Sequence, residues 1–174
     1  MRKIIYYVAA SLDGCIARDN GAVDWLPVPA GKQDYGYAAF LRRVDTLVFG
    51  RKTYEQALGF GEWPYGDRAC YVLSRKWAGQ RDARARFVGG NVAALLRRLK
   101  RRPGRDIWLV GGGESAHVCL EAGLVDEIIL TVIPTVLGGG RALFLRSLRT
   151  RRLRLRRCRA FADGLVQLHY AVTA

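Results

Sequence analysis

The sequence predicts an α/β fold with a mostly parallel central sheet, flanking helices and a C-terminal antiparallel hairpin. Short apolar runs rich in β-branched and aromatic residues alternate with helix-compatible segments along most of the chain, as in proteins built from βα units. The last part differs, because arginines and leucines alternate at 152–156 and Asp163-Gly164 is a hairpin turn signal. The 174 residues contain no internal repeat or linker, so we expect a single domain over 1–174.

Each expected element follows from its pattern of apolar residues and from the turn residues that bound it. Strands are expected at 3–10, 46–50, 69–73, 86–88, 107–110, 125–133 and 165–172. The alternation at 152–156 predicts a further strand that is half-exposed, with one buried face. Helices are expected at 34–43, 51–58, 92–101 and 114–122.

The chain is strongly basic, with a formal net charge of +14, and only five of its 29 basic residues are lysine. Such a charge has two interpretations: a surface that faces nucleic acid, an acidic membrane or a phosphorylated substrate, or the solvated surface of an arginine-biased protein. The excess of arginine indicates a coding bias, since a role as a point charge would accept lysine equally well. Half of the residues are hydrophobic, which argues against disorder.

The sequence indicates no metal site, leader or membrane span. The four cysteines are far apart and form no Cys-x-x-Cys pair, so we expect free thiols, mostly buried, and no zinc. The apolar run after Arg2 and Lys3 is too short for a membrane helix, and Asp13 follows it closely. A cytoplasmic location is therefore the default expectation. His117 and His169 fall inside expected elements, and we interpret both as structural.

Three corners at the ends of expected strands have the composition of phosphate-binding turns. Glycine lets backbone N–H groups approach an anion closely, and a helix that starts just behind adds the positive end of its dipole. Open α/β sheets usually bind ligands at the carboxyl ends of their strands, where these corners lie. The alternative for the triple glycine is a tight turn without a ligand. The corners are Gly50-Arg-Lys-Thr53, Leu73-Ser-Arg75 and Val110-Gly-Gly-Gly-Glu-Ser115.

Together with four further segments, these corners resemble the dihydrofolate reductase-like superfamily, and most closely the reductase domain of bifunctional riboflavin biosynthesis proteins (the RibD C-terminal domain family). The order and spacing of the segments carry the resemblance, which covers nearly the whole chain. Two departures stand out: the zinc deaminase signatures of the bifunctional proteins are absent, and the Gly-Arg-Lys-Thr corner looks more like the folate enzymes. The further segments are Ser11-Leu-Asp-Gly14, Asp24-Trp-Leu-Pro27, 120–129 and 134–139.

The resemblance implies a reductase that binds NADPH across the carboxyl ends of the strands. It implies that residues 51–53 hold phosphates and that residues 111–115 cradle the pyrophosphate. Ser74 and Arg75 would contact the adenosine 2′-phosphate, assisted by a basic residue at 51–52; a 2′-phosphate requires such cations, so the chemistry agrees. The implied cofactor-binding residues are together Ala10, Gly50, Arg51, Lys52, Thr53, Ser74, Arg75, Val110, Gly111, Gly112, Gly113, Glu114 and Ser115.

On the substrate side, the resemblance implies that Asp34 and Thr131 are catalytic and bind the substrate. It implies substrate contacts for Trp25 and Asp13 as well. A buried carboxylate bonded to a hydroxyl could bind the amide-like edge of a pyrimidine or pterin and support protonation. Simpler interpretations remain open: Asp34 as a helix cap, Trp25 as a core residue and Asp13 as a turn residue.

The first functional hypothesis is an NADPH-dependent reductase that transfers hydride to the C=N bond of a pyrimidine ribosylamine phosphate, similar to the 5-amino-6-(5-phosphoribosylamino)uracil reductase of riboflavin biosynthesis. The alternative within this fold is a dihydrofolate or pterin reductase. The nicotinamide would supply the hydride, so no side-chain nucleophile is needed. A retained fold that binds NADPH without an efficient reaction is a third possibility. Similarity to the riboflavin-type reductases also implies a homodimer.

A hypothesis of another class is a basic nucleic-acid-binding module. Nine arginines between 141 and 159 meet no acidic residue there, and such a face could neutralise several phosphates. The alternative, which we favour, is a solvated strand face, because the arginines from 149 to 159 have no aromatic residues between them. A salt-dependent gel shift separates the two.

Overall fold

The computed structural model describes residues 1–27, 33–146 and 149–173, and within these ranges the chain forms one large sheet, one two-stranded sheet and four helices. The helices are α1 (Tyr37–Arg43), α2 (Arg51–Leu58), α3 (Val92–Arg101) and α4 (Gly113–Glu121). The large sheet contains β1 (Ile4–Ser11), β3 (Val44–Gly50), β4 (Ala69–Leu73), β5 (Ala85–Val88), β6 (Asp106–Gly111), β7 (Glu127–Ile133), β9 (Leu153–Ala160) and β10 (Val166–Val172). The small sheet pairs β2 (Cys15–Ala17) with β8 (Arg141–Ala142).

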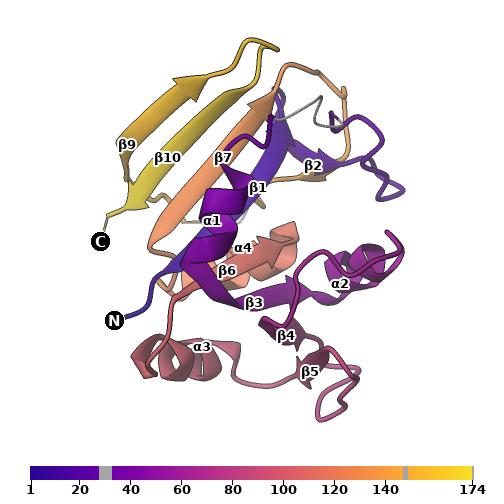
Figure 1. Cartoon of the computed structure of the whole chain (residues 1–174), viewed down its shortest axis with the longest axis vertical. Coiled ribbons are helices and arrows are strands. Elements are labelled where there is room, and N and C mark those ends of the chain that lie inside the picture. Colours follow the sequence, from indigo (N-terminus) through magenta and orange to yellow (C-terminus); the bar gives the residue numbers. More distant parts are fainter. Residues whose placement is uncertain (28–32, 147–148, 174) are drawn as a thin grey trace.

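The strand order across the large sheet is β5-β4-β3-β6-β1-β7-β10-β9 (Figure 1). The strands from β5 to β7 are all parallel, and β10 and β9 add an antiparallel hairpin at one edge. The predicted architecture of a mostly parallel sheet with flanking helices and a C-terminal antiparallel hairpin is therefore confirmed. Because parallel strands end at the same edge, the carboxyl ends of β3, β4 and β6 lie side by side.

Alternation of side chains along the strands explains why helices cover both faces of the sheet. In β1, Ile4 points into the core formed with α3 and α4, whereas Ile5 points into the core formed with α1 and α2. Strands β3 and β6 divide their side chains between the same two cores. Strands buried on both faces need continuous apolar runs, which is what the sequence contains.

Helix α1 begins at Tyr37, whereas the sequence predicted a start at Asp34. Tyr35 and Gly36 both have positive φ angles, 53° and 84°, so the chain cannot be helical there. The predicted bounds of α2 and β4 agree with the structure. The prediction that most thiols are buried is confirmed, with Cys158 as the exposed one among the four cysteines.

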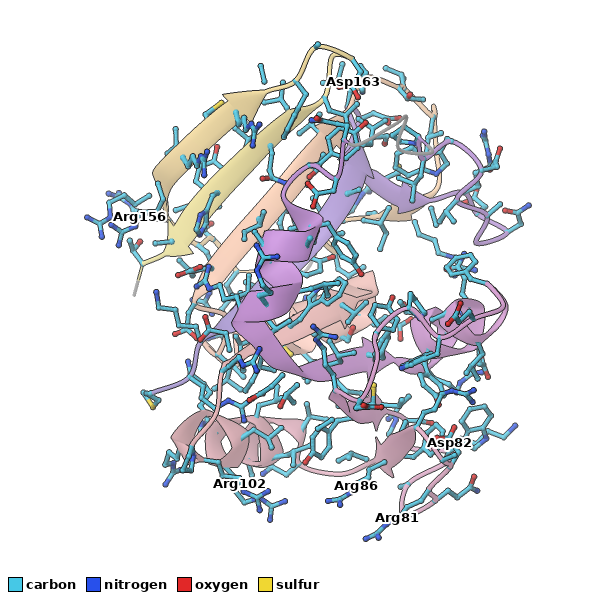
Figure 2. All side chains as sticks on the ribbon, viewed as in Figure 1. Arg81, Asp82, Arg86, Arg102, Arg156 and Asp163 are labelled. Carbon is cyan, nitrogen blue, oxygen red and sulfur yellow. The ribbon has the colours of Figure 1, made fainter. Side chains whose placement is uncertain are left out.

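Strand β9 is exposed on both faces, so the prediction of a half-exposed strand with one buried face is wrong. All of its residues are exposed, including Leu153 at 40% and Leu155 at 51%. The alternation did predict a strand, but β9 is the last strand of the sheet and nothing in the described ranges covers either of its faces. Figure 2 shows Arg156 projecting from this edge and Asp163 at the turn between β9 and β10.

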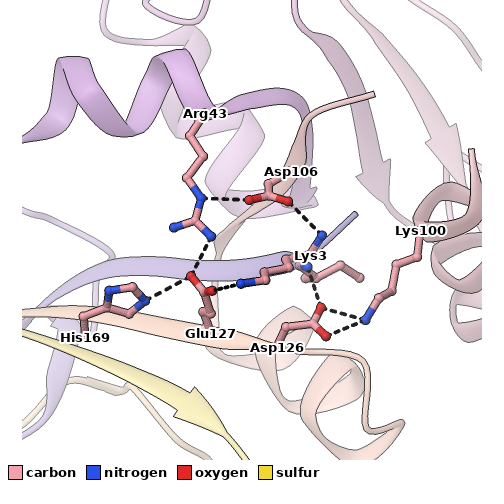
Figure 3. A network of polar contacts seen from close by, with 8 residues as sticks. Lys3, Arg43, Lys100, Asp106, Asp126, Glu127 and His169 are labelled. Atoms are coloured by element: carbon pink, nitrogen blue, oxygen red, sulfur yellow. Dashed lines mark hydrogen bonds and ion pairs between the residues drawn. The ribbon is translucent and has the colours of Figure 1, made fainter. Parts of the chain in front are cut away.

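A network of ion pairs joins the amino-terminal ends of β1, β6 and β7, opposite to the glycine corners (Figure 3). Its centre is Glu127, whose side chain is only 9% exposed. The carboxylate of Glu127 accepts hydrogen bonds from Nζ of Lys3 at 2.6 Å and from Arg43 at 2.7 Å, and Nε2 of His169 lies 3.0 Å away. Arg43 also bonds Asp106 at 2.8 Å. The network therefore ties α1 and β10 to three neighbouring parallel strands.

The pH dependence of folding tests this network. Burial alone would raise the pKa of Glu127, but hydrogen bonds from Lys3 and Arg43 outweigh it and lower the pKa to about 2. The carboxylate therefore stabilises the fold fully above the pKa of an unfolded glutamate, 4.5, and loses this effect as the pH falls towards 2. We expect Glu127→Gln to lower the free energy of unfolding by about 3 kcal/mol near neutral pH, because it leaves buried cations without an anionic partner.

Urea unfolding near neutral pH and at about pH 3 provides the measurement. The loss of stability on acidification should be larger for the wild-type protein than for Glu127→Gln. Glu62→Gln, at an exposed glutamate, serves as the control and should follow the wild type. Equal acid sensitivity in all three proteins would contradict the assigned role of Glu127.

Candidate functional site

The carboxyl ends of β3 and β6 approach so closely that a side chain has little room at the contact. A Cβ atom built on Gly50 would lie 3.3 Å from the carbonyl oxygen of Gly111, the amide nitrogen of Gly112 and the hydroxyl oxygen of Ser115. Such a contact is tighter than side chains normally make, so a larger residue would require its neighbours to move by a few tenths of an ångström. Two corners that are far apart in the sequence thus form one structural unit.

Two helices begin at this contact, one on each face of the sheet. Helix α2 starts directly after β3 and α4 directly after β6, and they pack into opposite cores. The boundary between β3 and β6 is therefore a topological switch point, the place where open α/β sheets bind ligands. The N–H groups and dipoles of both helix N-termini favour an anion there. The hydroxyl of Thr53 lies at this boundary, 3.3 Å from the position of a Cβ built on Gly112.

The start of α4 is held in place by the small sheet. A Cβ atom on Gly113 would lie 2.8 Å from the backbone carbonyl oxygen of Ala142 in β8, so this position requires glycine. The hydroxyl of Ser115 donates a 2.7 Å hydrogen bond to the carbonyl of Gly112, and the Gly111–Gly112 peptide bond is cis. Of the other predicted residues near this corner, Ala10 is buried, Val110 is half-buried and Glu114 is exposed.

The third predicted corner lies at the end of β4, the neighbour of β3. Ser74 is buried, and its hydroxyl oxygen accepts a hydrogen bond from the N–H of Trp77 at 3.2 Å, which closes a short turn. Arg75 in this turn is exposed, as is Lys52 in the first turn of α2. The three corners therefore follow one another along the edge in the strand order β4, β3, β6, with the exposed cations Lys52, Arg75 and Lys76 beside them.

Arg51 is engaged with other protein groups rather than pointing freely at a phosphate. Its guanidinium group bonds both carboxylate oxygens of Glu55, at 2.6 and 2.7 Å, and lies 5.6 Å from the centre of the Trp77 ring. The pair is an i,i+4 contact on α2. Lys52 is thus the residue of this corner whose charge is exposed and available.

Asp34 is a helix-capping residue in the structure, and the expectation of a buried carboxylate bonded to a hydroxyl is wrong. Asp34 is exposed, and its carboxylate accepts hydrogen bonds from the N–H groups of Ala38 at 3.0 Å and Gly36 at 2.9 Å. These two bonds, with Ala38 first, lower the pKa of Asp34. The backbone turn at Gly36 directs the carboxylate to the open N–H groups at the start of α1.

Thr131 is buried on β7, and its partner is Gln167, a residue that the sequence did not single out. The Nε2 of Gln167 donates to the hydroxyl oxygen of Thr131 at 3.2 Å and to the carbonyl of Tyr35 at 3.3 Å. The register explains the pair, because Gln167 of β10 lies directly opposite Thr131. Burial raises the pKa of the neighbouring Tyr7, the amide of Gln167 lowers it in part, and the charge of Asp34 raises it.

Asp13 and Trp25 both have structural roles, as the simpler interpretations proposed. The carboxylate of Asp13 accepts hydrogen bonds from the hydroxyl of Ser11 at 2.6 Å and from the N–H groups of Leu137 and Gly138 at 3.1 and 2.8 Å. It therefore ties the end of β1 to the loop after β7. Trp25 is half-buried and packs against the small apolar cluster around Phe161.

Other classes of site are not found in the described part of the chain. Across residues 1–27, 33–146 and 149–173, no three His, Cys, Asp or Glu side chains gather closely enough to hold a metal ion. None of the helices in these ranges has the length and hydropathy that a bilayer-spanning helix needs.

The fold defines the class of protein: the chain is an α/β protein with the dihydrofolate reductase-like fold. A solved structure of dihydrofolate reductase from Enterococcus faecalis, complexed with NADP(H) and RAB-propyl, aligns with a TM-score of 0.69 over 99% of this chain and 97% of that chain. At 15% sequence identity, this likeness shows the fold alone.

Two closer comparisons and a family model identify the family. The model of the RibD C-terminal domain matches residues 2–167. A putative riboflavin biosynthesis protein from Shewanella sp. PV-4 is 30% identical and aligns over 100% of both chains with a TM-score of 0.88. The uncharacterized protein YwjB of Bacillus subtilis is 39% identical over 170 residues, 97% of each chain. This chain belongs to the RibD C-terminal domain family, which confirms the resemblance predicted from its motifs.

Substitution of Gly113 tests the close approach that shapes the site. We expect Gly113→Ala to lower the free energy of unfolding by about 1–3 kcal/mol, because the new methyl group meets a backbone oxygen that cannot turn away. Gly139→Ala should be nearly neutral, since a Cβ there meets nothing within 4 Å. Urea unfolding of both variants measures the difference, and equal stability of the two would contradict the geometry.

Proposed function

We propose that this protein is an NADPH-dependent reductase whose substrate is a pyrimidine ribosylamine phosphate. In this reaction a hydride adds to the carbon of a C=N bond, a proton adds to the nitrogen, and NADPH becomes NADP⁺. The observation that carries the proposal is the convergence of two helix N-termini on the glycine contact between β3 and β6 in a member of the RibD C-terminal domain family. The Shewanella relative is named a putative riboflavin biosynthesis protein, which supports a substrate from that biosynthesis.

The residues at this edge fit a dinucleotide that carries a 2′-phosphate. Gly50 and Gly112 are both half-buried, so backbone atoms at their contact are partly exposed, and both helix dipoles favour the charge of a pyrophosphate there. Beside it, Arg75 and Lys52 are exposed cations that would pair with the 2′-phosphate. Since Arg51 is engaged with Glu55, we assign the contact with the 2′-phosphate to Arg75 first.

When bound, NADPH supplies the hydride, and the chain supplies binding, orientation and a proton donor. We assign substrate orientation to Thr131 and Gln167, since the Thr131 hydroxyl retains its own proton for a further hydrogen bond and the Gln167 carbonyl is a free acceptor. An amide and a hydroxyl match the alternating donors and acceptors of a pyrimidine edge. Tyr7, whose pKa is raised, stays protonated at neutral pH and is our candidate for the neutral donor beside them.

Cofactor preference tests the assignment of Arg75. We expect the wild-type protein to bind NADPH at micromolar concentrations, and Arg75→Ala to weaken this binding about tenfold while NADH binding changes less than about twofold. Fluorescence titration or calorimetry with both cofactors provides the measurement. Arg97→Ala, at an exposed arginine on α3, is the control and should change neither. Absence of NADPH binding at high micromolar protein would contradict the proposed function itself.

The substrate side is tested by following NADPH oxidation with the two candidate substrates. We expect turnover of 5-amino-6-(5-phosphoribosylamino)uracil and none of dihydrofolate. Gln167→Ala should lower kcat/KM about tenfold or more, because the Thr131 hydroxyl loses its partner, while the Kd for NADPH changes less than about twofold. Faster turnover of dihydrofolate would favour the pterin alternative, and an unchanged kcat/KM in Gln167→Ala would contradict the role of this pair.

We also propose that the protein forms a homodimer through one face of the β9–β10 hairpin. A bulge at Arg156 keeps the apolar residues of β9 on the same face as those of β10, because the register shifts there. On this face lie Leu153, Leu155, Cys158 and Ala160, opposite Val172, Tyr170, Leu168 and Val166. None of these eight residues is charged, and packing them against a second copy around a two-fold axis would leave Arg154, Arg157 and Arg159 of the other face in water.

Sedimentation velocity tests the dimer. We expect the wild-type protein to sediment as a dimer at micromolar concentration, and Leu155→Asp to shift it towards the monomer, because the substitution places a charge on the apolar face. Arg154→Asp, on the neighbouring residue that points to the opposite face, should remain dimeric. A wild-type monomer at this concentration would contradict the proposal.

A further inference from the structure

A groove with no part in the proposed reductase site lies under α3, at the β5 edge of the sheet. Its volume is about 550 Å³. The floor is apolar, with Tyr71 and Val88 from the sheet and Leu95 from α3. The walls are the loop at 79–81 and one side of α3. Figure 2 shows Arg81, Arg86 and Arg102 projecting from this edge of the molecule.

Four arginines from three separate elements line the groove: Arg81 from the loop, Arg86 from β5, and Arg98 and Arg102 from α3 or its end. No aspartate or glutamate lines it. Within the described ranges, none of the four guanidinium groups makes a hydrogen bond or an ion pair, in contrast to Arg43, Arg51 and Arg68 elsewhere in the fold. The groove therefore concentrates positive charge that the protein itself does not neutralise.

The carboxylate nearest in sequence does not neutralise this charge. Asp82 follows Arg81, but it accepts a 2.5 Å hydrogen bond from the hydroxyl of Tyr54 and two more from the N–H groups of Arg84 and Ala85. These bonds engage the carboxylate with the turn before β5 and with α2. The arginines of the groove are left facing one another and solvent.

The arginines also stand in two like-charged pairs. Arg81 and Arg86 lie directly opposite each other in an antiparallel bridge, and Arg98 lies in the last turn of α3, four residues before the C-cap residue Arg102. Like charges in both arrangements repel each other and destabilise the fold slightly. An anion bound between the members of each pair converts this repulsion into attraction, and the guanidinium fork matches phosphate oxygens in particular.

We propose that this groove binds a small molecule that carries a chain of two or more phosphates. The volume falls in the range of small-molecule sites, and the cations on both walls require an extended anion. The half-buried ring of Tyr71 on the floor offers a surface on which an aromatic base can stack. Inorganic polyphosphate and a nucleoside polyphosphate share the chemistry of the phosphate chain.

The proposal is independent of the proposed reductase function. None of the residues assigned to NADPH lines the groove, although Ala78, which precedes Gly79 of the groove, donates its backbone N–H to the carbonyl of Arg75. From there the groove follows α3 away from the carboxyl ends of the strands, as far as Arg102 near the start of β6. Loss of one activity should therefore leave the other intact.

Calorimetric titration of the full chain with inorganic tripolyphosphate tests the groove. We expect micromolar binding that weakens with added salt, and at least about a tenfold loss of affinity in the double variant Arg98→Glu/Arg102→Glu. Arg97→Glu/Arg101→Glu is the matched control: it makes the same charge change on the same helix at exposed arginines outside the groove. Its affinity should stay within about threefold of the wild type. No binding by the wild type, or an equal loss in both variants, would overturn the proposal.

Two further titrations identify the ligand and distinguish the groove from the proposed NADPH site. Tighter binding of ATP than of tripolyphosphate identifies a nucleotide, and equal binding identifies the phosphate chain alone; either supports the groove. Tripolyphosphate binding that persists in saturating NADPH supports a separate site, and mutual displacement would overturn it. Failure to bind NADPH together with intact binding of tripolyphosphate would contradict the reductase function and leave the groove standing.

Discussion

The close approach of β3 and β6 at their carboxyl ends is the constraint on which the site depends. Gly50 faces the backbone of Gly111 and Gly112 with no side chain between them. This contact brings the N-termini of α2 and α4 to one point from opposite faces of the sheet. A larger residue at Gly50 would shift the strand ends by a few tenths of an ångström and with them the two helix dipoles.

The opposite edge of the sheet has a different physical character. There the amino-terminal ends of β1, β6 and β7 are joined by charged side chains around the buried Glu127. A buried carboxylate with several donors is sensitive to the loss of any one of them, so this edge is well suited to fixing the strand register. One edge thus holds the strands together through charged side chains, while at the other edge glycines bring the backbones of two strand ends into contact.

Much of the fold could be predicted because its signals are local. The apolar runs of a sheet buried on both faces, the glycines at strand ends and the Asp163-Gly164 turn are all visible in the sequence, and the bounds of α2 and β4 follow directly. The pairing of Arg51 with Glu55 was also accessible, since residues four apart on a helix are neighbours. The family resemblance then indicated which corners would meet, and the parallel sheet brings them to one edge.

The features that were missed depend on contacts between distant segments or on backbone angles. Gln167 is a partner of Thr131 only because of the register between β7 and β10, which no local pattern specifies. For Asp34 the sequence left a helix cap and a substrate ligand both open, and its capping contacts follow from the left-handed turn at Gly36. The exposure of Leu155 reflects the lack of a covering element in the described ranges, whereas a periodic pattern indicates only that a face is apolar.

We propose that the glycine contact between β3 and β6 is the anion-binding wall of an NADPH site. A crystal structure of the protein with NADPH is the decisive measurement. In that structure we expect the pyrophosphate between the N-termini of α2 and α4, against Gly50 and Gly112, with the 2′-phosphate at Arg75 and the nicotinamide towards Thr131. A pyrophosphate bound elsewhere, for example among the arginines under α3, would contradict it.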